Sequence, residues 1–209
     1  GMAAMGKIPF LSSYAVFSPG RNWEQIRTTI CYNNRNVKIV GSHAGVSVGP
    51  DGGSHQALED MAIMRALPRM RVVVPCDSIE AKKATISIAK NEGPVYLRLA
   101  REKTPVVTTA DSPFEFGKAS LLWNSEKPQV AIIACGPLVY NSLIAAKSLE
   151  AEGIQVSVLN LHTIKPLDIE AVVAVAKKAG RVVTCEEHQV AGGMGSAVAE
   201  VLAQNYPVP

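Results

Sequence analysis

The sequence predicts an α/β protein made of two consecutive units, each with a mostly parallel sheet flanked by helices. Short apolar runs typical of buried strands alternate along the 209-residue chain with segments whose apolar residues have helical spacing. Such alternation is typical of parallel sheets that helices cover on both faces. It is interrupted at residues 104–126 by Pro105, Pro113 and several polar residues. We therefore predict units at residues 1–103 and 127–209, joined by a linker at 104–126.

Helix and strand signals of the first unit follow one another closely. Trp23, Ile26 and Ile30 have helical spacing, and Pro68 ends another helical pattern. Asp77 is a favourable N-cap for the helix that follows it. The predicted helices span residues 2–7, 21–32, 57–67 and 79–90, and the predicted strands or extended segments span residues 8–17, 37–41, 71–75 and 95–100.

The second unit resumes the alternation after the linker. Two of its glycine-rich turns, Cys135-Gly136-Pro137 and Gly192-Gly193-Met194-Gly195, resemble turns that cradle phosphate, although neither matches the G-x-G-x-x-G pattern. Because such turns are also common without a ligand, we favour a purely structural role for both. The predicted strands span residues 130–135, 156–161 and 181–185, and the predicted helices span residues 138–150, 168–178 and 195–204.

Composition and charge argue against several classes of protein. The net charge is +3, and no basic run is longer than Lys82-Lys83 or Lys177-Lys178, which disfavours a nucleic-acid-binding surface. No apolar stretch reaches the length of a membrane span, and the N-terminus lacks the pattern of a signal peptide. We therefore expect a cytoplasmic protein that binds neither nucleic acid nor membrane.

The spacing of the cysteines gives no sign of a metal site. Cys31, Cys76, Cys135 and Cys185 lie far apart, and no C-x-x-C pair occurs. In the expected compartment, buried and reduced thiols are favoured over disulfides.

Residues 40–56 combine two imidazoles with a carboxylate. His43, Asp51 and His55 are interleaved with glycines, which let the backbone approach a ligand closely. The stretch follows the predicted strand at 37–41, and open α/β sheets bind their ligands at the carboxyl ends of strands. This arrangement indicates a polar site for a hydroxylated substrate. A surface loop with solvated histidines is the alternative, because Gly and Asp are also common in turns.

Several longer motifs resemble the C-terminal half of transketolase over nearly the whole chain, most closely the split bacterial and archaeal form whose halves are separate subunits. The most specific is the D-G-x-[ST]-H-Q box at residues 51–56, paired with His43 upstream. Deoxyxylulose-phosphate synthase usually has an arginine region at Ser42-His43, and 2-oxo acid dehydrogenase beta subunits lack the His-Gln pair, so both are disfavoured alternatives. The other matching motifs are residues 6–10, 15–21, 43–49, 96–101, 186–188 and 192–195.

The resemblance implies a pyrimidine-binding domain followed by a transketolase C-terminal domain. It also implies transfer of a two-carbon ketol unit between sugar phosphates by means of thiamine diphosphate. Phe17 would then stack on the aminopyrimidine ring with Tyr14 beside it, although the spacing of the two also fits plain core packing. His43 and His55 would be the catalytic residues, which hydrogen-bond oxygens of the donor sugar and shuttle protons.

The resemblance also implies which residues bind the sugar. Asp51 would accept a hydrogen bond from a hydroxyl, and Arg101 would bind the terminal phosphate, for which Arg98 is the weaker candidate. His162 and His188 match no ligand position, so we expect structural roles for both.

By the same resemblance, parts of the active site are expected outside this sequence. The family's catalytic glutamate would precede Gly1, and Glu24, which falls on the following helix, is not assigned its role. The motif that binds diphosphate and magnesium belongs to the N-terminal half, and relatives continue past Pro209 into a further strand. We therefore expect the chain alone to be inactive, and to act as a homodimer completed by an N-terminal half or subunit in the pentose phosphate pathway. A non-catalytic paralogue that kept the fold is a further alternative.

Overall fold

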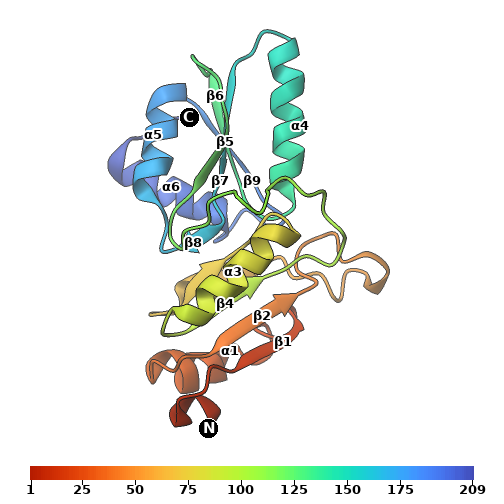
Figure 1. Ribbon diagram of the computed structural model, residues 1–209, viewed down its shortest axis with the longest axis vertical. Helices are drawn as coiled ribbons and strands as arrows, with labels where there is room; N and C mark the ends of the chain where they lie inside the picture. The colour runs from red at the N-terminus through yellow and green to blue at the C-terminus, as the bar shows by residue number, and fades with distance from the viewer.

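Two sheets form the framework of the protein in the computed structural model, which describes residues 1–209. Figure 1 shows the first unit, red to yellow-green, below the second unit, green to blue. The first sheet has the order β1-β2-β4-β3-β8. Neighbouring strands in it run parallel, except that β8 runs antiparallel to β3. Its strands are β1 (Phe10–Tyr14), β2 (Lys38–Ser42), β3 (Arg71–Val73), β4 (Val95–Arg98) and β8 (Thr163–Lys165).

The second sheet has the order β5-β7-β6-β9, and only β5 runs antiparallel to its neighbour. In Figure 1, α4 covers one face of this sheet, whereas α5 and α6 cover the other. The mostly parallel sheets flanked by helices confirm the predicted fold class. The elements are β5 (Ser120–Asn124), β6 (Val130–Ala134), α4 (Leu138–Ala151), β7 (Val156–Asn160), α5 (Ile169–Ala179), β9 (Val182–Cys185) and α6 (Met194–Asn205).

The helices of the first unit lie close to their predicted positions. The Asp77 side chain accepts a hydrogen bond from Glu80 N and so caps α3, as predicted. No helix of the structure combines the length and the apolar content that crossing a membrane requires. The helical segments are η1 (Met2–Met5), α1 (Trp23–Gln25), η2 (Ile26–Tyr32), η3 (Gly49–Asp51), α2 (Asp60–Ala66) and α3 (Ser78–Lys90).

The helix predicted at residues 21–32 forms, but most of it is a π-helix: α1 is followed directly by η2, which has wider turns. Thr28 Oγ1 donates to Glu24 O at 3.1 Å, so a side chain competes for a carbonyl of the helix backbone. The two buried residues of η2, Ile26 and Cys31, are five positions apart, and the wider turn of a π-helix suits that spacing better than an α-turn.

Two short strands were not predicted, and both connect parts of the chain that are distant in sequence. Residues 120–124, inside the predicted linker, form β5 at the edge of the second sheet. Residues 163–165 of the second unit form β8 and pair with β3 of the first. Buried apolar residues of both units also belong to a single core cluster of 25 residues. The two units therefore share one core, which fixes the second unit against the first.

Candidate active site

The candidate loop begins where β2 ends, beside the end of β1. The two strands are parallel with Tyr14 opposite Ser42, so the residues that follow them emerge at one edge of the sheet. His43 directly follows β2 and has a φ of 56°. That left-handed conformation is uncommon for residues other than glycine and often marks functional sites. The His43 ring lies flat against the ring of Tyr14, with centroids 3.8 Å apart and planes inclined by 10°.

Two further rings complete a cluster at this edge. His55, near the end of the loop, meets the Phe17 ring edge to face, with centroids 5.4 Å apart. The centroid of Tyr14 lies 5.9 Å from that of His55 and 6.2 Å from that of Phe17. The structure thus brings together four of the six predicted site residues, Tyr14, Phe17, His43 and His55. The guanidinium carbon of Arg21 lies 5.1 Å from the centroid of the Phe17 ring.

A serine orients each imidazole of the cluster. Ser42 Oγ lies 3.1 Å from His43 Nδ1, and Ser54 Oγ lies 2.9 Å from His55 Nδ1. In both pairs the serine directly precedes the histidine. Because Nδ1 is engaged by the hydroxyl, Nε2 is the nitrogen of each ring that can bond to a ligand.

Of the other two predicted residues, Asp51 belongs to this loop and Arg101 contacts it. Asp51 ends η3, and its Oδ2 is buried without a hydrogen-bond partner. Leaving such an atom unpaired costs about 1–3 kcal/mol. Arg101 Nη1 donates to Val48 O at 2.7 Å and lies 3.8 Å from Glu102 Oε1. A Cβ on Gly49 would come within 2.4 Å of Arg101 Nη1, so the guanidinium packs closely against the loop that carries Asp51.

Arg98 is a structural residue and is not available to a substrate. Its side chain is buried and forms an ion pair with Asp60, with Nε 2.7 Å from Oδ2. The Tyr96 hydroxyl donates to the same Oδ2 at 2.6 Å. Burial alone would lower the pKa of Arg98, but the adjacent Asp60 carboxylate more than offsets this and raises it. The guanidinium therefore stays charged and fully engaged inside the core.

His162 has the structural setting that was expected of it. Its ring is buried and stacks on Phe114 with centroids 4.4 Å apart. Burial lowers the pKa of His162 to about 4, against a smaller opposing effect of the Asp168 carboxylate. His188 Nδ1 lies 2.7 Å from Gln189 O, so this nitrogen must carry a proton, since a carbonyl can only accept.

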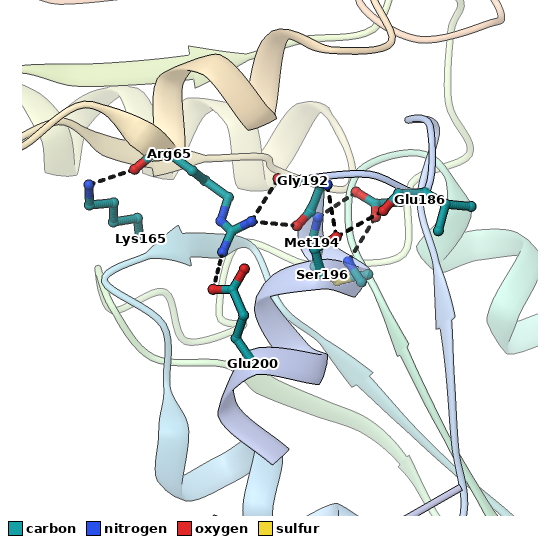
Figure 2. A network of polar contacts seen from close by, with 10 residues as sticks. Arg65, Lys165, Glu186, Gly192, Met194, Ser196 and Glu200 are labelled. Carbon is teal, nitrogen blue, oxygen red and sulfur yellow. Dashed lines mark hydrogen bonds and ion pairs between the residues drawn. The ribbon is translucent and has the colours of Figure 1, made fainter. Parts of the chain in front are cut away.

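Both glycine-rich turns of the second unit form hydrogen bonds within the protein. The Glu186 carboxylate accepts hydrogen bonds from Met194 N at 2.7 Å and Gly195 N at 2.8 Å, at the start of α6 (Figure 2). A carboxylate thus stands where a helix start would otherwise attract a phosphate. In the other turn, Gly136 N donates to Val74 O, so this turn packs against the first unit. The contacts of the Glu186 carboxylate agree with a structural role for the turn at residues 192–195.

The cysteines are all free thiols, and three of the four are buried. Burial raises the pKa of both Cys76 and Cys135, which keeps these thiols protonated and unreactive. No group of three or more His, Cys, Asp or Glu side chains is arranged to hold a metal ion.

One contact of the loop was missed by the sequence analysis. Ser47 Oγ donates to Glu187 Oε2 at 2.9 Å, across 140 positions of the chain. The motif at residues 186–188 was recognised, but no local pattern in the sequence indicates that its second glutamate contacts this loop.

Comparisons with known proteins match both units. Residues 1–107 match the family model described as transketolase, pyrimidine binding domain, and residues 117–208 match transketolase, C-terminal domain. The whole chain is 45% identical to the 6-deoxy-6-sulfo-D-fructose transketolase subunit SqwH of Clostridium sp. (strain MSTE9). Over 98% of its length it is 44% identical to a putative transketolase C-terminal section of Methanocaldococcus jannaschii. The chain spans 64% of the length of each of these relatives.

The fold also matches a solved structure. A protein described as "Split gene transketolase, inactive beta4 tetramer" superimposes with a TM-score of 0.91 at 48% sequence identity. The match covers 99% of this chain and 67% of the other.

Proposed function

The chain belongs to the transketolase family, and on that premise we propose that it forms the sugar-binding C-terminal part of a transketolase. The complete enzyme would move a two-carbon ketol unit between sugar phosphates. The observation that carries this proposal is the cluster of Tyr14, Phe17, His43 and His55 at the carboxyl edge of the first sheet. Flat rings and imidazoles at one edge suit a flat coenzyme and a hydroxylated donor.

Thiamine diphosphate fits the residues present at this edge. Phe17 offers a ring for offset stacking on an aminopyrimidine, and Tyr14 lies beside it with planes inclined by only 21°. The Arg21 guanidinium lies over the Phe17 ring, so it would move aside if the coenzyme used that face. When bound, the coenzyme supplies the nucleophile and the electron sink of ketol transfer. We propose that magnesium and the diphosphate are held by the N-terminal half of the enzyme.

The two histidines would bind and move protons at the donor sugar. Since Ser42 and Ser54 engage the Nδ1 atoms, we assign Nε2 of His43 and His55 to the carbonyl and hydroxyl oxygens of the donor. An imidazole can hold or release a proton near neutral pH, which suits a reaction in which hydroxyl protons leave and return.

Asp51 and Arg101 would select the sugar. The Asp51 carboxylate would accept a hydrogen bond from a hydroxyl of the correct stereoisomer and lack that bond with the wrong one. Arg101 would bind the anionic group at the far end of the donor, because a guanidinium matches tetrahedral oxyanions. One relative is named for a sulfo-sugar, so sulfonate and phosphate donors both belong in a test of this residue.

The assembly follows from the family. We propose that the chain works in the cytoplasm with an N-terminal transketolase half or subunit and that it also self-associates, with a dimer as the smallest unit. The similar structure described as an inactive β4 tetramer supports both self-association and the inactivity of this part alone. We also propose a pyrimidine-binding domain at residues 1–103, a linker and a C-terminal domain, with β5 assigned to the C-terminal domain because it pairs with β7.

Reconstitution tests the proposal. The chain is combined with its N-terminal half and assayed with xylulose 5-phosphate and ribose 5-phosphate, with sulfo-sugar donors, and with pyruvate and glyceraldehyde 3-phosphate. We expect ketol transfer from a sugar donor, no reaction with pyruvate, and no transfer by the chain alone. Turnover with pyruvate would favour a deoxyxylulose-phosphate synthase or an oxo acid dehydrogenase, and a complete assembly inactive on all donors would favour a non-catalytic paralogue.

A further inference from the structure

A short segment of the second unit, residues 186–189, crosses the candidate loop of the first. Glu187 supplies its main contact, because its Oε2 accepts from Ser47 Oγ at 2.9 Å. Gln189 N donates to Leu58 O at 3.0 Å, close to where the loop returns to α2. The segment therefore touches the loop on both sides of Asp51 and His55.

The loop backbone is shaped to receive Glu187. Gly45 has a φ of 94°, and a Cβ at this position would lie 2.2 Å from Glu187 Oε2. A side chain at position 45 would thus collide with the carboxylate, in addition to disfavouring the backbone conformation. Gly45 N also donates to Ala57 O. This close approach lies between His43 and Asp51, so a shift of Glu187 would displace the backbone that carries both.

Hydrogen bonds from both units anchor residues 186–189. Arg98 Nη2, from the buried ion pair, donates to Glu187 O at 2.8 Å. Figure 2 shows the next anchor along the chain, the Glu186 carboxylate, which accepts a hydrogen bond from Met194 N at the start of α6. The backbone of Glu187 is thereby fixed by residues of both units. Its carboxylate is therefore held in one position against the loop.

We propose that Glu187 is a positioning residue of the candidate active site, which holds the Gly45–Ser47 turn so that His43 and Asp51 face the same ligand. The inference rests on the proposed function for its catalytic meaning, whereas the positioning itself can be measured without turnover. The carboxylate forms its hydrogen bond with the Ser47 hydroxyl, and it lies against the loop backbone at Gly45.

Hydrogen exchange on the full chain tests the positioning. In Glu187→Ala, we expect amides of residues 43–52 to exchange roughly tenfold faster, since a hydrogen bond to a charged acceptor is lost. Glu187→Gln keeps an acceptor for Ser47 and should exchange like the wild type. Ser47→Ala removes the same hydrogen bond from the loop side, so it should also exchange faster, and adding it to Glu187→Ala should have little further effect.

Glu200→Gln is the matched control, because it weakens another contact between the units, the ion pair with Arg65. Exchange at residues 43–52 that is unchanged in Glu187→Ala, or raised equally in Glu200→Gln, would overturn the inference and leave Glu187 as plain packing between units. If Glu187→Ala does not fold, Ser47→Ala decides. In the reconstituted enzyme, kcat should fall roughly tenfold in Glu187→Ala and recover in Glu187→Gln. A wild-type assembly without ketol transfer would refute the proposed function and leave the exchange result standing.

Discussion

The imidazole of His43 lies parallel to the phenol ring of Tyr14, with 3.8 Å between the ring centroids. Each residue comes at the end of a different strand, and the parallel register of β1 and β2 places them side by side. His43 is also held through Nδ1 by Ser42. The stack and the serine together restrict the ring to one orientation, so Tyr14 acts on the candidate site through His43 as well as through its position beside Phe17.

Two replacements of Tyr14 should therefore distinguish the effect of the stacked ring on activity from the effect of the hydroxyl. In the reconstituted enzyme, Tyr14→Phe keeps a flat ring and should retain most of kcat/KM. Tyr14→Leu loses the stack, worth about 0.5–1.5 kcal/mol, and should lower kcat/KM by roughly two- to tenfold. Tyr32→Leu, at a ring that is largely exposed, is the control and should leave activity unchanged. Equal activity of Tyr14→Leu and the wild type would show that the stack does not orient His43.

Arg101 is predicted to recognise the charged end of the donor. Arg101→Lys keeps the charge but loses the planar fork of donors, so the KM for phosphorylated or sulfonated donors should rise roughly tenfold, and more in Arg101→Ala. Uncharged donors should be unaffected. Lys103→Met removes a nearby exposed cation and controls for general charge. If both variants raise KM equally, the effect is long-range steering of anions, and the specific role of Arg101 is refuted.

Much of the fold could be predicted because its signals are local. Asp77 caps α3 and Asp168 caps α5, and each lies beside the apolar pattern of its own helix. The strands β5 and β8 were missed for the opposite reason. β8 has only three residues and gains its hydrogen bonds from β3, far away in the sequence. Only the tertiary structure distinguishes such a segment from a loop.

In the candidate site, too, the residues with local sequence signals could be predicted, whereas a contact between distant parts of the chain could not. His43, Asp51 and His55 lie within one motif and could be found together, and the parallel β1 and β2 explain why Tyr14 joins them. The contact with Glu187 could not be predicted, since it joins the two units across 140 positions. A contact of this kind depends on how the shared core fixes one unit against the other.

The buried ion pair of Asp60 and Arg98 should be costly to break. Asp60→Asn leaves the buried guanidinium of Arg98 without a counter-charge, and Arg98→Met leaves the buried carboxylate of Asp60 without a counter-charge. Each should lower the free energy of unfolding by about 3–5 kcal/mol in urea titrations. The double variant should cost clearly less than the two single changes together, because neither charge is then left alone. A double variant whose loss equals that sum would mean that the two side chains act independently.

His162 should make the folded chain sensitive to acid. Its pKa in the folded state is about 4 because the ring is buried, whereas an unfolded histidine has a pKa of about 6.5. The unfolded state therefore binds more protons between these values, so the stabilising effect of His162 is complete above pH 6.5 and is lost as the pH falls towards 4. Between pH 7 and pH 5 the loss amounts to about 2 kcal/mol. Urea titrations at both pH values should show that His162→Gln is destabilised less by acid than the wild type. Lys127→Gln, a control variant at an exposed position, should lose as much stability as the wild type when the pH is lowered. An identical pH response of His162→Gln and the wild type would show that His162 takes up no extra proton on unfolding.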